Sequence, residues 1–127
     1  EQSIAWAREH YATDRCRFEP RDVLTLEGGF DVLVSLETIE HFADDGLYHL
    51  ACERYGFSQV ILSYPSKKST HFNPFHLRDL NRQTICSSFR NYVLYHRFSQ
   101  GDVDFLLFLR KPAAMPSHVV ENIVDLA

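Results

Sequence analysis

The chain has 127 residues, of which 45% are hydrophobic and 24% are charged, so it is long enough to bury the core of one domain. Its net charge of −4 leaves no basic excess to neutralise phosphates, which argues against general nucleic-acid binding and against a membrane-surface protein. The three cysteines share no metal-type spacing, as is usual for free thiols in a reducing compartment, and we expect a cytoplasmic protein.

Helices and strands are predicted to alternate along the chain. Apolar residues at helical spacing predict a helix over residues 3–11, and short apolar segments predict strands over 16–18, 31–35 and 59–63. Acidic residues before 46 and a glycine at 56 delimit a second helix over 46–55, and a third is expected over 77–87. Strands 92–98 and 104–110 follow, and a last short helix is expected over 117–126.

This alternation predicts an α/β fold with a mostly parallel sheet and an antiparallel C-terminal strand. The last two strands must be antiparallel because their connection is too short for a crossover. Val32, Leu33 and Val34 form an apolar run without alternation, which predicts a strand that is buried on both faces.

Charged and polar residues follow that strand at once. Ser35, Glu37, Glu40 and His41 lie where an open α/β sheet places its ligand crevice, and the last three would share one face of a helical turn. The loop 71–76 follows the neighbouring strand, so parallel topology should bring His76 close to Glu40 and His41.

Four motifs carry a family resemblance. FDVLVSLETIEHF, VILSYPS, HFNPFHLRDL and the segment SIAWAREHYATDRCRFEPRDVLTL resemble, in order and spacing, the C-terminal two-thirds of class I S-adenosylmethionine-dependent methyltransferases of types 11, 12 and 23. The resemblance implies a partial Rossmann-like sheet, with residues 1–112 as an incomplete methyltransferase domain and 113–127 as a tail.

The family's glycine-rich first motif and its ribose-binding acid would lie upstream of residue 1, and Tyr55-Gly-Phe-Ser58 replaces the usual turn before the next strand. We therefore expect the chain to be a fragment that alone has little cofactor affinity and is inactive, with an exposed sheet edge that favours self-association.

The resemblance also assigns cofactor-binding roles. Asp22 matches the carboxylate that binds the adenine amino group, with Val23 beside it, although Asp22 could equally be an ordinary loop residue. Ser35, Leu36 and Glu37 match the residues that line the methionine part of S-adenosylmethionine.

His41 is the candidate catalytic base for a hydroxyl or amine acceptor. Together, Glu37, Glu40, His41 and His76 resemble the divalent-metal site of certain O-methyltransferases, where Mg²⁺ or Mn²⁺ would suit the ligands. The alternative is that Glu40 and His41 hydrogen-bond within their own turn while His76 braces the loop.

The sequence thus predicts methyl transfer from S-adenosylmethionine to a small-molecule or sugar-type acceptor. A metal-assisted O-methyltransferase and a non-catalytic α/β interaction module remain alternatives. Phe72, Phe75 and Tyr64 could form an acceptor pocket, or they could pack into the core and anchor the loop. The acceptor and the methylated atom are not encoded in any motif.

Overall fold

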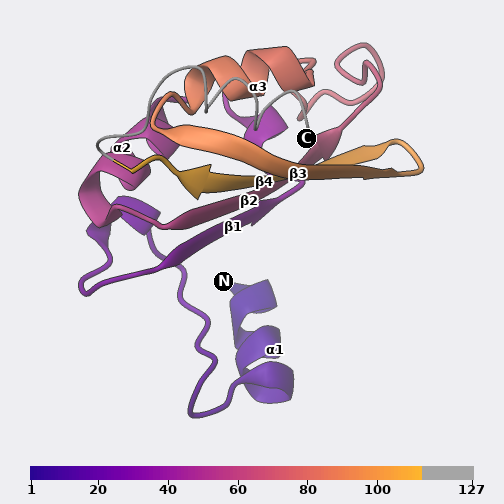
Figure 1. Ribbon diagram of the computed structural model, residues 1–127. Coiled ribbons are helices and arrows are strands. Elements are labelled where there is room, and N and C mark those ends of the chain that lie inside the picture. The colour runs from indigo at the N-terminus through magenta and orange to yellow at the C-terminus, as the bar shows by residue number, and fades with distance from the viewer. Residues whose placement is uncertain (113–127) are drawn as a thin grey trace.

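The structure is a computed structural model, and it describes residues 1–112. Four strands form one sheet, with two helices packed against it and a third, N-terminal helix set apart below strand β1 (Figure 1). The elements in chain order are α1 (Gln2–Tyr11), the 3-10 turn η1 (Val23–Thr25), β1 (Val32–Leu36), the 3-10 turn η2 (Ile39–His41), α2 (Gly46–Tyr55), β2 (Gln59–Pro65), α3 (Arg82–Ser88), β3 (Tyr92–Gln100) and β4 (Val103–Arg110).

The strands lie in the order β1-β2-β4-β3. β1 pairs with β2 in parallel, whereas β4 is antiparallel to both of its neighbours, so three strands point one way and β4 points the other. This confirms the predicted α/β sheet with its antiparallel last strand. Leu36 pairs with Ser63, so β1 and β2 end at the same edge of the sheet.

The core lies on one face of this sheet, under α2 and α3. Val60 and Leu62 of β2 and Phe108 of β4 are fully buried there, against Tyr48 of α2 and Ile85 of α3. Helix α2 has the predicted bounds and ends at Gly56, whose φ of +59° is left-handed and whose N–H donates to the Cys52 carbonyl at 2.9 Å.

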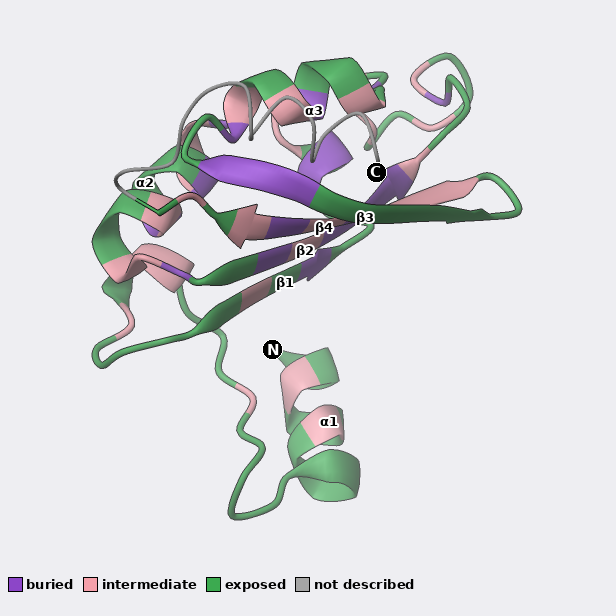
Figure 2. Cartoon of the chain, viewed as in Figure 1, coloured by how far each residue is buried: buried purple, intermediate pink, exposed green. Residues whose placement is uncertain are grey.

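The opposite face of β1 is open, and the prediction that this strand is buried on both faces is wrong. Leu33 and Ser35 face the core, but Val32, Val34 and Leu36 are exposed, Val34 by 55%. Exposed and covered bands alternate along β1 in Figure 2. Helix α1 does not cover them, because none of its residues is buried. β1 is therefore an edge strand with the alternating pattern of a half-covered sheet.

The predicted strand at residues 16–18 is also wrong. Thr13 and Cys16 exchange backbone hydrogen bonds in a tight turn, and the Phe18 carbonyl accepts from Nε of Arg8 at 2.8 Å. These backbone groups are thus bonded locally and to α1, and no strand of the described sheet lies beside them. A strand without a partner ladder does not form.

The third helix begins at Arg82 and not at residue 77. Asn81 caps this helix, because its side-chain oxygen accepts from the Thr84 N–H at 2.9 Å. The backbone of Asn81 is itself extended, so the helix begins at the next residue. The helix expected over 117–126 lies outside the described residues. Within residues 1–112, no helix is both long and apolar enough to cross a membrane.

Candidate active site at the ends of β1 and β2

The chain turns sharply where β1 ends. Glu37 has a φ of +48°, a left-handed conformation that is costly for a residue with a side chain. Two bonds hold it: its N–H donates to the Ser63 carbonyl at 3.1 Å and to Oγ of Ser63 at 2.9 Å. Partial burial and, next, the nearby Glu40 carboxylate raise the pKa of Glu37 above its ordinary value of 4.5.

Glu40, His41 and His76 form a close cluster beyond this turn. Nε2 of His41 lies 3.7 Å from Oε1 of Glu40, and Nε2 of His76 lies 3.9 Å from the same oxygen. The two imidazole rings meet edge to face with centroids 4.9 Å apart. The predicted approach of His76 to Glu40 and His41 is thus confirmed, while Glu37 is outside the three-residue group whose ligand atoms lie within 4.8 Å of one another.

The Glu40 carboxylate is buried without a hydrogen-bond partner. Its side chain is 1% exposed, and neither oxygen receives a hydrogen bond within residues 1–112. Leaving a buried polar group unpaired costs about 1–3 kcal/mol, and more when the group is charged. The alternative in which the Glu40 side chain hydrogen-bonds within its own turn is therefore wrong.

The hydrogen bonds of the two imidazoles decide which nitrogen faces Glu40. Nδ1 of His41 lies 2.8 Å from the Phe75 carbonyl, which can only accept, so Nδ1 carries a hydrogen. A neutral His41 then presents the Nε2 lone pair to the carboxylate. Nδ1 of His76 is bonded to Oγ of Ser69 at 2.6 Å, which also leaves Nε2 facing Glu40. A carboxylate and lone pairs that converge in this way need a proton or a cation between them, and His76 can supply that proton from Nε2 because the Ser69 hydroxyl can donate to its Nδ1.

The loop that supplies His76 is fastened to η2. The Leu77 N–H donates to the Glu40 carbonyl at 2.8 Å, next to the bond between His41 and the Phe75 carbonyl. His76 thus braces the loop through Ser69, as the structural alternative predicted, and at the same time directs its other ring nitrogen at Glu40.

The supporting cation of this site was not identified from the sequence. Arg78 donates from Nη2 to Oδ1 of Asp45 at 2.6 Å, from Nε to the Phe42 carbonyl at 2.8 Å and from Nη2 to the Ile39 carbonyl at 3.0 Å. Asp45 is buried and also accepts from Ser88. The only sequence signal was an arginine two residues after His76, which ordinary loop composition would also produce.

The predicted cofactor-binding residues lie in two places. Asp22 accepts from the Leu24 N–H at 2.9 Å and caps η1, and the Val23 carbonyl accepts from the Tyr55 hydroxyl at the C-terminal end of α2. Ser35, in contrast, is at the strand end, but its hydroxyl is buried against the Tyr48 hydroxyl at 2.7 Å. A ligand at the strand end could therefore contact Ser35 only through its backbone.

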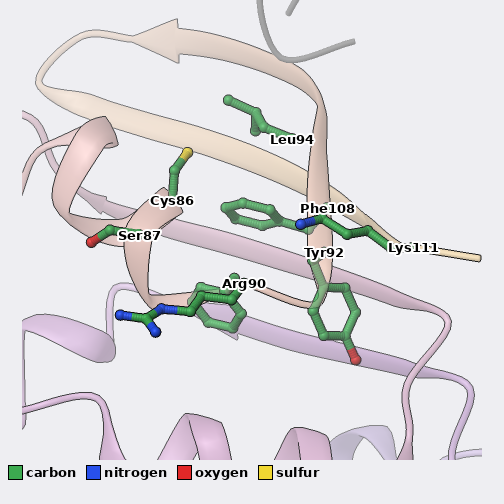
Figure 3. Close-up of a pocket in the computed structure, with 8 residues that line it drawn as sticks. Cys86, Ser87, Arg90, Tyr92, Leu94, Phe108 and Lys111 are labelled. Atoms are coloured by element: carbon green, nitrogen blue, oxygen red, sulfur yellow. The ribbon is translucent and has the colours of Figure 1, made fainter. Parts of the chain in front are cut away.

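Leu36, 51% exposed, and the strained Glu37 are the strand-end side chains that a ligand could reach. The hollow of about 350 Å³ drawn in Figure 3 lies elsewhere. It is bounded by the end of α3, the start of β3 and the end of β4, with Cys86, Phe108 and Lys111 among its lining residues. Leu109 of β4 pairs with Gln59 at the start of β2, so this hollow lies at the end of the sheet where β1 and β2 begin, opposite the candidate site.

No protein-family profile and no curated protein matches the sequence. Among solved structures, a protein described as a candidate type 11 methyltransferase from Sulfolobus solfataricus is similar, with a TM-score of 0.67, 16% identity, and 92% of this chain and 70% of that chain covered. Magnesium protoporphyrin IX methyltransferase from Synechocystis PCC 6803, solved with bound SAH, gives a TM-score of 0.62 at 15% identity, covering 84% and 57%.

These similarities establish the fold over most of the chain. It is like that of class I S-adenosylmethionine-dependent methyltransferases, as the sequence motifs predicted. The chain spans 57% of the length of the second protein, which is well short of the whole.

Proposed function

We propose that this chain, with its class I methyltransferase-like fold, carries the acceptor side of an enzyme that methylates a small-molecule or sugar-type hydroxyl with S-adenosylmethionine. The observation that carries the proposal is the cluster of Glu40, His41 and His76, in which the unpaired Glu40 carboxylate meets two imidazoles at the edge where β1 and β2 end. Ligands of open α/β sheets bind at that edge.

S-adenosylmethionine would supply a methyl group on a sulfonium, which already reacts readily with an oriented nucleophile. The protein's task is then mainly to position the acceptor and to take up its proton. His41 is the proposed base, because its side chain is 40% exposed and its Nδ1–H bond to the Phe75 carbonyl fixes the Nε2 lone pair as the proton acceptor. Leu36 and Glu37 would line the cofactor side of the same edge. The adenine contact expected of Asp22 and Val23 is not part of this proposal, because their 3-10 turn is bonded to Tyr55, which lies beside Phe30 at the start of β1.

A divalent cation is the second proposal for the same cluster. Glu40, His41 and His76 offer one carboxylate and two imidazoles, and each imidazole is oriented by a hydrogen bond at its other nitrogen, as is usual for metal-ligating histidines. A bound Mg²⁺ or Mn²⁺ would neutralise Glu40 and supply Lewis acidity. Glu37 is outside this group and would at most be a further ligand.

The two proposals make opposite demands on His41. The single lone pair on Nε2 can take a proton from the substrate hydroxyl or bind a metal ion, but it cannot do both. A non-catalytic module is the weaker alternative, because an interaction scaffold gains nothing from a buried carboxylate that lacks a partner.

Substitutions in the full-length protein test the function. With the acceptor pool of a small-metabolite extract and S-adenosylmethionine carrying a ¹³C-methyl group, we expect labelled product from the wild type and at least a hundredfold less from His41→Gln and Glu40→Gln. His49→Gln, at an exposed histidine of α2, is the matched control and should keep its activity. Equal activity in all three variants would refute the proposed site.

Metal binding is tested separately by Mn²⁺ titration followed by electron paramagnetic resonance. If the cation proposal is correct, the protein binds one Mn²⁺ ion, and His76→Gln and Glu40→Gln abolish binding whereas His49→Gln does not. If no Mn²⁺ binds while methyl transfer persists in EDTA, His41 acts as a base without a metal.

A further inference from the structure

Two phenylalanine side chains stand exposed beside the candidate site. Phe72 is 68% exposed and Phe75 is 74% exposed, although both belong to the loop that delivers His76. The sequence allowed these residues to be core or loop anchors, and neither side chain has that role. Tyr64, the third aromatic residue considered, is fully buried, and its hydroxyl donates to Asp104.

The backbone beneath both rings is firmly held. The Phe72 N–H donates to the Ser69 carbonyl at 3.1 Å, and the Phe75 N–H donates to Oδ1 of Asn73 at 3.0 Å. Asp79 closes the base of the loop by accepting from the Ser69 N–H at 2.8 Å. The rings are therefore exposed on a fixed loop and not on a loose one, and fixed loops are where binding residues concentrate.

Phe75 connects this surface to the cluster directly. Its carbonyl holds Nδ1 of His41 at 2.8 Å, and His76 is the next residue in the chain. The Phe75 backbone is thus joined directly to both imidazoles of the cluster. A carboxylate at Glu40, 3.9 Å from Nε2 of His76, disfavours an anionic molecule beside the imidazoles.

We propose that Phe72 and Phe75 form a platform that binds the flat apolar face of a neutral, hydroxyl-bearing ring and directs its hydroxyl to His41. This rests on the proposed function, because it names the acceptor of that site. Aromatic side chains bind rings by offset or edge-to-face contact, and a few polar groups then fix the orientation. The ring can be aromatic or the apolar face of a sugar, and both present the same chemistry to the platform.

The test is a binding titration on the full-length protein in EDTA with SAH present, using 4-methylphenol and methyl β-D-galactopyranoside as probes and saturation-transfer NMR as the readout. We expect one of the two probes to bind, which identifies the ring type. The double variant Phe72→Ala/Phe75→Ala should bind that probe at least tenfold more weakly. Tyr95→Ala, at a 58% exposed aromatic residue of the distant strand β3, should stay within twofold of the wild type.

Calorimetric SAH binding, measured on the same samples, separates this inference from the proposed function. If SAH binds and neither probe does, or if the double variant binds as the wild type does, the platform is refuted while the proposed function stands. If a probe binds through Phe72 and Phe75 but SAH does not, the platform stands and the proposed function fails. Circular dichroism should show the double variant folded, because both rings are exposed.

Discussion

Replacing Glu40 by glutamine should stabilise the metal-free protein while it removes activity. The carboxylate is 1% exposed and has no hydrogen-bond partner, which costs about 1–3 kcal/mol relative to a paired group. A glutamine amide can donate to the Nε2 lone pair of His41, and its oxygen or its second N–H can pair with Nε2 of His76 in either tautomer; both nitrogens lie within 4 Å of the present oxygen. Most of the cost should then be recovered, which corresponds to a Tm increase of roughly 4–12 °C for a domain of this size.

Urea unfolding of the full-length protein, followed by circular dichroism, measures this change in EDTA and again in Mn²⁺. In EDTA we expect Glu40→Gln to be more stable than the wild type, and Glu53→Gln, at an exposed site on α2, to differ by less than about 0.5 kcal/mol. If Mn²⁺ binds, it should stabilise only the wild type, by about 2.7 kcal/mol at a hundredfold excess over Kd. A Glu40→Gln variant that is less stable than the wild type in EDTA would show that the carboxylate has a structural partner, and the reasoning would fail.

Three further changes test the supports of the site and the open edge. Arg78→Ala leaves the buried Asp45 carboxylate without its cation and should cost about 3–5 kcal/mol in urea unfolding; a loss below 1 kcal/mol would contradict the role assigned to it. Hydrogen bonds from Ser69 and Thr70 lower the pKa of Asp79, so the stability it gives is present above the ordinary pKa of 3.8 and is lost as the pH falls through its lowered pKa in the folded protein. Protection of the Ser69 amide against exchange, taken relative to its intrinsic rate at each pH, should therefore fall in acid, whereas in Asp79→Asn the protection should be reduced and should not change as the pH falls. Val34→Lys on the exposed face of β1 should reduce self-association of the chain in analytical ultracentrifugation, and unchanged association would exclude this surface.

Local signals in the sequence were sufficient for most of the fold. Gly56 ended α2 where predicted, because only a left-handed residue without a side chain suits that position easily. Pro65 marked the end of β2, and the two-residue turn between β3 and β4 required these strands to be antiparallel. These features depend on neighbours within a few residues, which a sequence displays directly.

The errors arose where a distant partner decides the structure. Val32-Leu-Val34 has the same apolar letters whether one face of the strand or both are covered, and only the position of α1 shows that one face is open. Cys16 to Phe18 had strand-like residues but no ladder to join. The start of α3 was misplaced because Asn81 forms its cap and Asp79 instead closes the preceding loop.

The candidate site was predictable in part for a physical reason. Parallel strands end at one edge, so the residues after β1 and the loop after β2 had to approach each other, and Glu40, His41 and His76 do. The inward turn of the Ser35 hydroxyl onto Tyr48 depends on a contact across the core, and so does the support from Arg78. Neither is visible in residue spacing.

The most direct test of the central claim is SAH binding to the full-length protein, measured by calorimetry and mapped by backbone NMR. The account predicts micromolar binding, with chemical-shift changes at Leu36, Glu37 and Glu40, at the edge where β1 and β2 end. No binding to the full-length protein, or shift changes confined to the hollow around Cys86 and Phe108 at the opposite edge, would contradict it.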